Sequence, residues 1–261
     1  KNIIKLNFFF LLLFISFIIF KSHDDFSYYH FPYIYYLTQS KIMLGIGNFN
    51  HGFRTPSSIF YLNSLFYLPV IKYYFFQIGA ILIMGFSSYQ FIYLIKEKLT
   101  QKKYDKFFFL SLFFFMFTVI FFYRIAEHGT DRSAQILIFL LIIELLIIIN
   151  FDKSIKECII KILIILGLVI SLKSFYILYL AFTFPVFYYF IIERKFRYIL
   201  LIFKSLYFYL FLFLFGNILF VNFANSGCLI YPVSITCSDY FIWSIPLQEV
   251  SAMNDWYEQW S

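Results

Sequence analysis

Residues 159–192 read IIKILIILGLVISLKSFYILYLAFTFPVFYYFII, and this stretch decides how the chain folds. It carries two charged side chains, Lys161 near its start and Lys173 near its middle. A membrane-spanning helix needs about 20 apolar residues, so the stretch is too long for one upright helix. A charge at membrane depth is also costly. We therefore expect two shorter helices that turn at Lys173-Ser174.

The basic residues that follow the stretch support this turn. Arg194, Lys195 and Arg197 come directly after it. Two helices return the chain to the face from which it started, and this cluster then lies on the inner side with most other Lys and Arg residues. A single helix would place the cluster outside and would break the positive-inside trend.

The composition excludes a water-soluble globular domain. Of the 261 residues, 62% are hydrophobic, 26% are aromatic and 13% are charged. A soluble domain is about half apolar and about a quarter charged, so the excess apolar surface must face lipid. The net charge of +7 comes from Lys and Arg clusters between apolar runs. This pattern indicates membrane topology and not a nucleic-acid-binding surface.

The pattern predicts an all-α, polytopic membrane protein with about seven transmembrane helices. We expect them at 3–20, 70–95, 107–122, 134–149, twice within 159–192, and at 199–223. The predicted inner segments hold 14 of the 21 Lys and Arg residues, which places the N-terminus in the cytoplasm. Residues 1–223 form the transmembrane module. Residues 224–261 form an outer loop, which we expect to continue into a further C-terminal part.

The first predicted outer loop, residues 21–69, is rich in Tyr, His, Asn and Ser. Its two polar-aromatic stretches, 26–40 and 56–68, are too polar to span a membrane. Tyr is favoured at the boundary between lipid and water. We therefore expect two short helices that lie at this interface.

The clearest cluster of reactive side chains is HDDFSYYH at 23–30, three residues beyond the first predicted span. Asp24 and Asp25 lie there at the membrane surface. They could act as a general base toward a hydroxyl group, or hold a divalent cation that neutralises a pyrophosphate. The alternative is structural, with Asp25 capping the next helix and Asp24 solvated.

A second predicted outer loop carries Arg124, Glu127, His128, Asp131 and Arg132. Glu127 and Asp131 are four residues apart and would share one face of a helical turn. His128 could move a proton or contact a phosphate. The loop is short and would hold these groups close to lipid phosphates. The alternative is a solvated connector in which the Arg and acidic side chains pair with each other.

Two charges within apolar stretches require partners. Lys173 would find one in a lipid phosphate, or would extend to the interface as a snorkelling lysine. Glu144 lies within the span predicted at 134–149. We favour a structural role for it, either hydrogen-bonded between helices or shielded by a neighbouring cation.

Two of the three cysteines, Cys228 and Cys237, share the last predicted outer loop. In an oxidising compartment they could form a disulfide. The alternative is two unpaired thiols.

The acidic pair after a first span, followed by a long outer loop with interfacial helices, resembles the GT-C glycosyltransferase superfamily. Later outer segments are similar to an uncharacterised family of bacterial multi-pass membrane proteins related to that superfamily. The matching segments are EHGTD at 127–131, LKSF at 172–175 and SGCLIYP at 226–232, with Cys237 and Trp243. The resemblance covers most of the chain as a pattern of spans and outer motifs.

The resemblance implies an inverting transferase of cell-envelope polysaccharide biosynthesis at the outer face of the bacterial inner membrane. It would move a sugar from a polyprenyl-phosphate donor to a lipid, glycan or protein acceptor. Asp24 or Asp25 would be the catalytic base. Donor phosphate binding would fall to Lys173, Arg124, Arg132 and His128, with Glu127, Asp131, His30 and Tyr231 in support.

No cofactor is required in this interpretation, although Asp24 and Asp25 could hold a divalent cation. The expected partners are the lipid-linked donor, the bilayer and an unknown acceptor, and no nucleic acid. The alternative function is a transporter or flippase of a lipid-linked glycan. In that case Glu144 would be the coupling group, because transporters place critical polar groups near the midplane.

Overall fold

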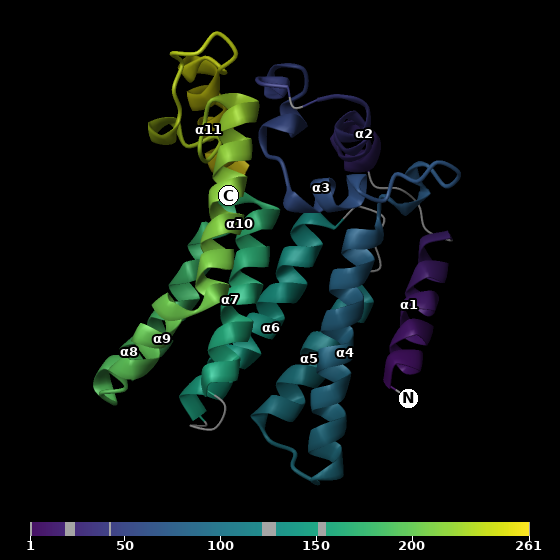
Figure 1. Ribbon diagram of the computed structural model, residues 1–261, viewed down its shortest axis with the longest axis vertical. Coiled ribbons are helices and arrows are strands. Elements are labelled where there is room, and N and C mark those ends of the chain that lie inside the picture. Colours follow the sequence, from purple (N-terminus) through teal and green to yellow (C-terminus); the bar gives the residue numbers. More distant parts are fainter. Residues whose placement is uncertain (1, 19–23, 42, 122–128, 151–154, 261) are drawn as a thin grey trace.

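A computed structural model of the protein describes residues 2–18, 24–41, 43–121, 129–150 and 155–260. This part of the chain is helical and contains no strand. Its long helices run side by side as a bundle (Figure 1). The all-α class predicted from the sequence is therefore confirmed.

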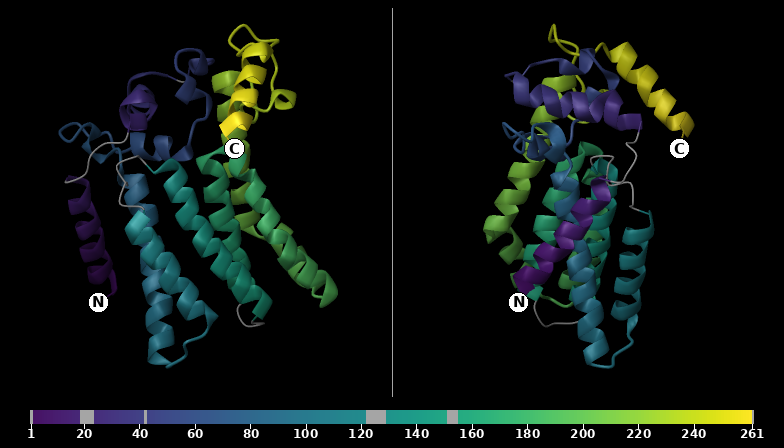
Figure 2. Two further views of the ribbon diagram at one scale, coloured as in Figure 1. Left: turned by 180° about the vertical axis from the view of Figure 1, so that it is seen from behind. Right: turned by 90° about the vertical axis from the view of Figure 1, so that its right-hand side faces the viewer.

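The bundle is built from helices that follow one another along the chain. They are α1 (Asn2–Ile18), α4 (Ile78–Thr100), α5 (Lys106–Phe121), α6 (Thr130–Asn150), α7 (Ile155–Leu172), η6 (Ser174–Thr183), α8 (Phe184–Ile192), α9 (Phe196–Lys204) and α10 (Leu206–Ser226). Short elements cover one end of it, namely η1 (Phe26–His30), α2 (Phe31–Gln39), η3 (His51–Arg54), α3 (Ser58–Ser64) and α11 (Leu247–Trp260). We call residues 24–41, 43–77 and 227–260 the cap, and both views of Figure 2 show it at the same end.

Four helical segments of the described chain are long and apolar enough to cross a membrane. They are Tyr73–Thr100, Thr130–Asn150, Ser174–Ile192 and Leu206–Ser226. Two further apolar helices are shorter, Ile3–Phe14 and Lys106–Ile120. These helices are compatible with a membrane protein. The predicted count of seven spans is not confirmed.

The chain turns at Lys173, as the sequence predicted. Helix α7 ends at Leu172, and Lys173 is extended, with φ −154° and ψ 137°. Helix η6 begins at the next residue, Ser174, and continues into α8. The turn lies at the cap end of the bundle, so the backbone itself brings Lys173 toward the cap.

The centre of the bundle is the packing of α7 against α6 and α10. Leu141, Val169 and Ile170 are fully buried there. A Cβ atom at Gly167 would lie 3.4 Å from the Cα of Phe211, so this glycine allows α10 to approach α7 closely. Small residues at helix contacts have this effect in membranes, where packing drives helix association.

The two interfacial stretches predicted in the first loop do contain helices. The first stretch forms η1 and α2. The second forms α3, where Ser57 accepts a hydrogen bond from the backbone of Ile59. The alternative role for Asp25 as a helix cap is not supported, because its side chain makes no capping hydrogen bond.

Helices η1 and η3 meet at Gly52, where a Cβ atom would lie 2.2 Å from the Cγ atom of Tyr29.

The C-terminal part of the cap begins where α10 ends. Gly227 has a φ of +80°, a conformation that favours glycine, and it turns the chain away from the helix. Cys228 and Cys237 form a disulfide, one of the two alternatives left open by the sequence. The loop then leads into α11, which lies beside the cap end of α10 (Figure 1).

Asn225 joins the first loop to α10. Its side-chain amide donates to the hydroxyl of Tyr33 at 2.9 Å and to the carbonyl of Phe53 at 3.0 Å. The Tyr33 hydroxyl lies 3.0 Å from that of Tyr61. Burial, followed by the neighbouring Tyr61, raises the pKa of Tyr33. Tyr33 therefore stays neutral and serves as a structural hydrogen-bonding group.

We expect the substitution Asn225→Leu to lower the melting temperature of the purified protein by about 2–8 °C, because two buried polar groups would lose their donor. Differential scanning fluorimetry in detergent measures this change. Asn217→Leu is the matched control, since Asn217 is exposed on the same helix. Equal effects of the two substitutions would contradict the structural role of Asn225.

Candidate functional site

An ion pair lies where the bundle meets the cap. The Lys173 ammonium is 2.6 Å from Asp131 Oδ1, and the Tyr176 hydroxyl donates to the same oxygen at 2.5 Å. Lys173 and Tyr176 come from the turn after α7, and Asp131 comes from the first turn of α6. The Lys173 side chain is 23% exposed and that of Asp131 is 54% exposed. Asp131 therefore orients the ammonium, and both side chains of the pair are partly exposed.

His30, at the end of η1, is close enough to Asp131 for their charges to interact. It is 2% exposed and packs against Phe60, with ring centroids 5.1 Å apart. Asp24 and Asp25 lie just before η1, with Asp24 exposed and Asp25 half-buried. The acidic pair therefore directly precedes η1, the helix whose last residue, His30, lies within electrostatic range of Asp131.

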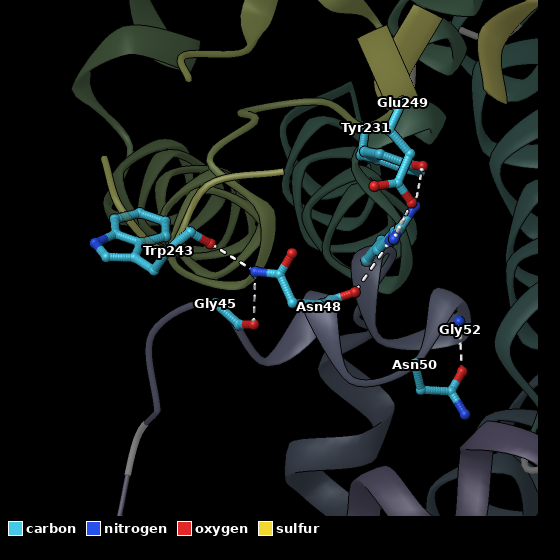
Figure 3. Close-up of polar contacts among 9 residues, drawn as sticks. Gly45, Asn48, Asn50, Gly52, Tyr231, Trp243 and Glu249 are labelled. Atoms are coloured by element: carbon cyan, nitrogen blue, oxygen red, sulfur yellow. Dashed lines mark hydrogen bonds and ion pairs between the residues drawn. The ribbon is translucent and has the colours of Figure 1, made fainter. Parts of the chain in front are cut away.

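Arg54 of η3 joins the two halves of the cap. Its Nε donates to the carbonyl of Gly47 at 3.0 Å and its Nη1 to the Tyr231 hydroxyl at 3.0 Å. Its Nη2 donates to Glu249 Oε1 at 2.5 Å. Figure 3 shows Tyr231 and Glu249 converging from the C-terminal part on the loop that contains Gly45 and Asn48. Asn48 adds a bond of 2.8 Å to the carbonyl of Trp243.

Burial and hydrogen bonding shift the pKa values of the groups around Arg54. Burial alone would lower the pKa of Arg54, but the hydrogen bonds to Tyr231 and Glu249 outweigh it and raise the pKa. Burial, followed by the positive charge of Arg54, lowers the pKa of His51, and Glu249 offsets part of this effect. Burial raises the pKa of Tyr231 despite its bond to Arg54. The cluster therefore holds one permanent cation, a neutral tyrosine and a histidine that resists protonation.

Tyr257 of α11 lies within electrostatic range of both clusters. Burial raises its pKa; Tyr231 and Asp131 raise it further, and Arg54 lowers it. Charges in both clusters therefore affect the pKa of Tyr257. The two clusters contain residues of four separate parts of the chain: His30 with 45–54, Asp131, 173–176 and 231–257.

The other predicted site residues do not all lie at the Lys173–Asp131 pair. Arg132 lies in the first turn of α6, and its Nη1 is 3.5 Å from Gln135 Oε1. Tyr231 bonds Arg54 and not the Lys173 pair. Three predicted residues, Arg124, Glu127 and His128, lie outside the described residues.

Arg54, Glu249 and Tyr176 were not among the site residues predicted from the sequence. Arg54 is the only Arg in the loop at 21–69, and this was the one available signal. Glu249 lies 195 residues away from it, so no local spacing connects the two. Tyr176 follows Lys173 by one helical turn, which allows both side chains to reach one oxygen.

Among the residues that the structure describes, no group of three or more His, Cys, Asp or Glu side chains is arranged to hold a metal ion. A cation at Asp24 and Asp25 would therefore need ligands from its substrate, such as phosphate oxygens. The divalent cation remains a prediction.

Glu144 has a cationic partner on the neighbouring helix. Lys161 of α7 lies 2.8 Å from its Oε1 atom, and the Glu144 side chain is 13% exposed. Both residues lie toward the end of the bundle opposite the cap. Glu144 is thus shielded by a neighbouring cation, as in the structural role that we favoured.

One comparison with known proteins gives a match. The model of a family described as a domain of unknown function (DUF8201) matches residues 1–261, the whole chain. No curated protein and no solved structure matches the chain.

We expect Arg54→Met to lower the free energy of unfolding by about 3 kcal/mol, because it removes the donor to the buried Gly47 carbonyl and Tyr231 hydroxyl. Glu249→Gln should cost less than about 1 kcal/mol, since Glu249 is half exposed and the Gln keeps an oxygen acceptor. Thermal unfolding and limited proteolysis of residues 227–260 measure both effects. An Arg54→Met protein as stable and as protease-resistant as the Glu249→Gln protein would contradict the assigned role.

The lowered pKa of His51 predicts a pH effect on stability. The folded state binds fewer protons at this site than the unfolded state does. The stability contributed by neutral His51 is complete above its ordinary pKa of 6.5 and is lost as the pH falls below that value. Melting temperatures from pH 7.5 to 5 should therefore fall less steeply in His51→Gln than in the natural protein. Parallel curves would rule out this contribution.

Proposed function

The chain belongs to the DUF8201 family, and we propose that it is a membrane glycosyltransferase of the GT-C type. It would transfer a sugar from a polyprenyl-phosphate donor to a lipid, glycan or protein acceptor. The observation that carries the proposal is the Lys173–Asp131–Tyr176 cluster, which lies at the cap end of the spanning helices. A lipid phosphate lies at this depth when its polyprenyl chain is in the bilayer.

The donor phosphate would bind at Lys173. The ammonium is a compact cation on a flexible stem, and Asp131 and the α7–η6 turn hold it in place before a ligand arrives. Positioned charges of this kind stabilise a phosphate leaving group without reorganisation during the reaction. The partly exposed Asp131 would move aside or share the ammonium with the phosphate. Arg132, in the same turn as Asp131, would supply further positive charge.

The reaction would be a single inverting displacement. The acceptor oxygen attacks the anomeric carbon, and the bond from that carbon to the phosphate oxygen breaks. The electron pair leaves with polyprenyl phosphate. The hydroxyl proton passes to Asp24 or Asp25, the two carboxylates that directly precede η1.

The topology that we propose places the cap outside the cell. The N-terminus is cytoplasmic, and seven helices cross the bacterial inner membrane, including α1, α5 and α7. The Cys228–Cys237 disulfide supports this placement, because disulfides persist in oxidising compartments such as the periplasm. The Lys-rich turn between α4 and α5 then faces the cytoplasm.

The transporter alternative depends on Glu144. Its pairing with Lys161 favours a structural ion pair over a coupling group that binds and releases protons. We therefore rank transferase activity above transport.

The test uses membranes that contain the full chain and a panel of polyprenyl-phosphate sugars. Release of polyprenyl phosphate is the readout because it does not require a known acceptor. Asp24→Asn or Asp25→Asn should reduce the rate by about 10²- to 10⁴-fold. Lys173→Gln should reduce it by about 10²- to 10³-fold.

Two controls keep this test specific. Lys72→Gln removes an exposed cation of the cap, and Glu144→Gln removes the carboxylate that pairs with Lys161. Both should stay within a few-fold of the natural rate. Loss of activity in Glu144→Gln, with unchanged activity in Asp24→Asn and Asp25→Asn, would favour the transporter and contradict the transferase.

A further inference from the structure

A basic pocket lies at the end of the bundle opposite the cap. It occupies about 610 Å³ between α7, α9 and the first turn of α10. Three cations line it, Lys156, Arg197 and Lys204, and no Asp or Glu is among its described lining residues. Figure 1 shows α8 and α9 extending away from the cap on this side of the bundle. The pocket is therefore a separate feature from the cluster around Lys173.

Helix α9 gives the pocket its mixed character. Arg197, Leu200 and Lys204 share one face of the helix because they are spaced by three, four and seven residues. Ile202, on another face, is buried against the bundle. A short helix with one buried apolar face and cations at its ends is typical of a segment that lies at a membrane surface.

The walls of the pocket fit both parts of a phospholipid. Leu200, Leu201 and Ile160 supply an apolar surface beside the three cations. The Arg197 side chain is oriented by Tyr198, since its Nη2 donates to the Tyr198 hydroxyl at 3.1 Å. A guanidinium has five N–H donors, so this bond leaves others for a phosphate.

We propose that this pocket binds the phosphate head group of an anionic phospholipid from the leaflet at that end of the bundle. The charge of the pocket is complementary to such a lipid. Basic pockets between helices on the cytoplasmic side of membrane proteins recognise anionic head groups in this way. The acyl chains lie along Ile160, Leu200 and Leu201, next to the surrounding lipid. The site does not depend on the proposed glycosyltransferase activity.

Native mass spectrometry of the full-length protein in detergent tests the proposal, with dioleoylphosphatidylglycerol and dioleoylphosphatidylcholine as the two probes. The natural protein should bind phosphatidylglycerol about 10-fold or more tightly than phosphatidylcholine. The triple substitution Lys156→Gln, Arg197→Gln and Lys204→Gln should abolish this preference. Lys204→Gln alone should reduce it by a few-fold, which provides a test if the triple variant does not fold.

The matched control replaces Lys96, Lys102 and Lys103 with Gln. These three exposed cations lie at the same end of the bundle, around the turn between α4 and α5, and the change in charge is identical. This variant should retain the preference for phosphatidylglycerol within two-fold.

Three results would overturn the proposal. Equal loss of binding in the control and pocket variants would show non-specific attraction to basic surfaces. Equal binding of the two lipids by the natural protein would show that the head-group charge is not recognised. Displacement of phosphatidylglycerol by millimolar inorganic phosphate would identify a site for soluble anions instead of a lipid site.

Discussion

The arrangement of the cap end depends on the ion pair between Lys173 and Asp131. An ammonium placed near the middle of the long apolar stretch 159–192 must reach water or an opposite charge. The chain satisfies it by ending α7 at Leu172, extending Lys173 and starting a new helix at Ser174. The pair also sets the position of α6, because Asp131 lies in its first turn. The Lys173–Asp131 ion pair thus holds the end of α7, the start of η6 and the start of α6 close together.

A second charge, Arg54, has the same effect within the cap. Its buried guanidinium meets acceptors from the first loop, the loop after α10 and α11. Asn225 and the carbonyl of Ala224, which accepts from Gly45, add bonds between the first loop and α10. The cap is therefore a single assembly of segments that lie about 200 residues apart in the chain. Tyr257 lies within electrostatic range of Asp131, Tyr231 and Arg54.

Local patterns in the sequence predicted the helical class, the turn at Lys173 and the helices of the first loop, because each depends on neighbouring residues. They also predicted that Glu144 needs a partner, since an intramembrane carboxylate is costly. Pairs distant in the sequence were not predictable. Asp131 lies 42 residues before Lys173, and nothing in the spacing separates it from Glu127 as a partner. The pairing of Arg54 with Glu249 likewise depends on the tertiary fold alone.

The central claim is that the acidic pair and Lys173 lie at one face of the membrane, around a shared anionic ligand. The most direct test is a spin-label distance between Cys residues introduced at the exposed positions Asp24 and Phe175, in full-length protein in lipid nanodiscs. Cys158 is buried and the other two cysteines are bonded to each other, so labelling would be selective. We predict a distance well below the bilayer core thickness of about 30 Å. A distance of about 30 Å or more, with the labels quenched from opposite sides, would contradict the account.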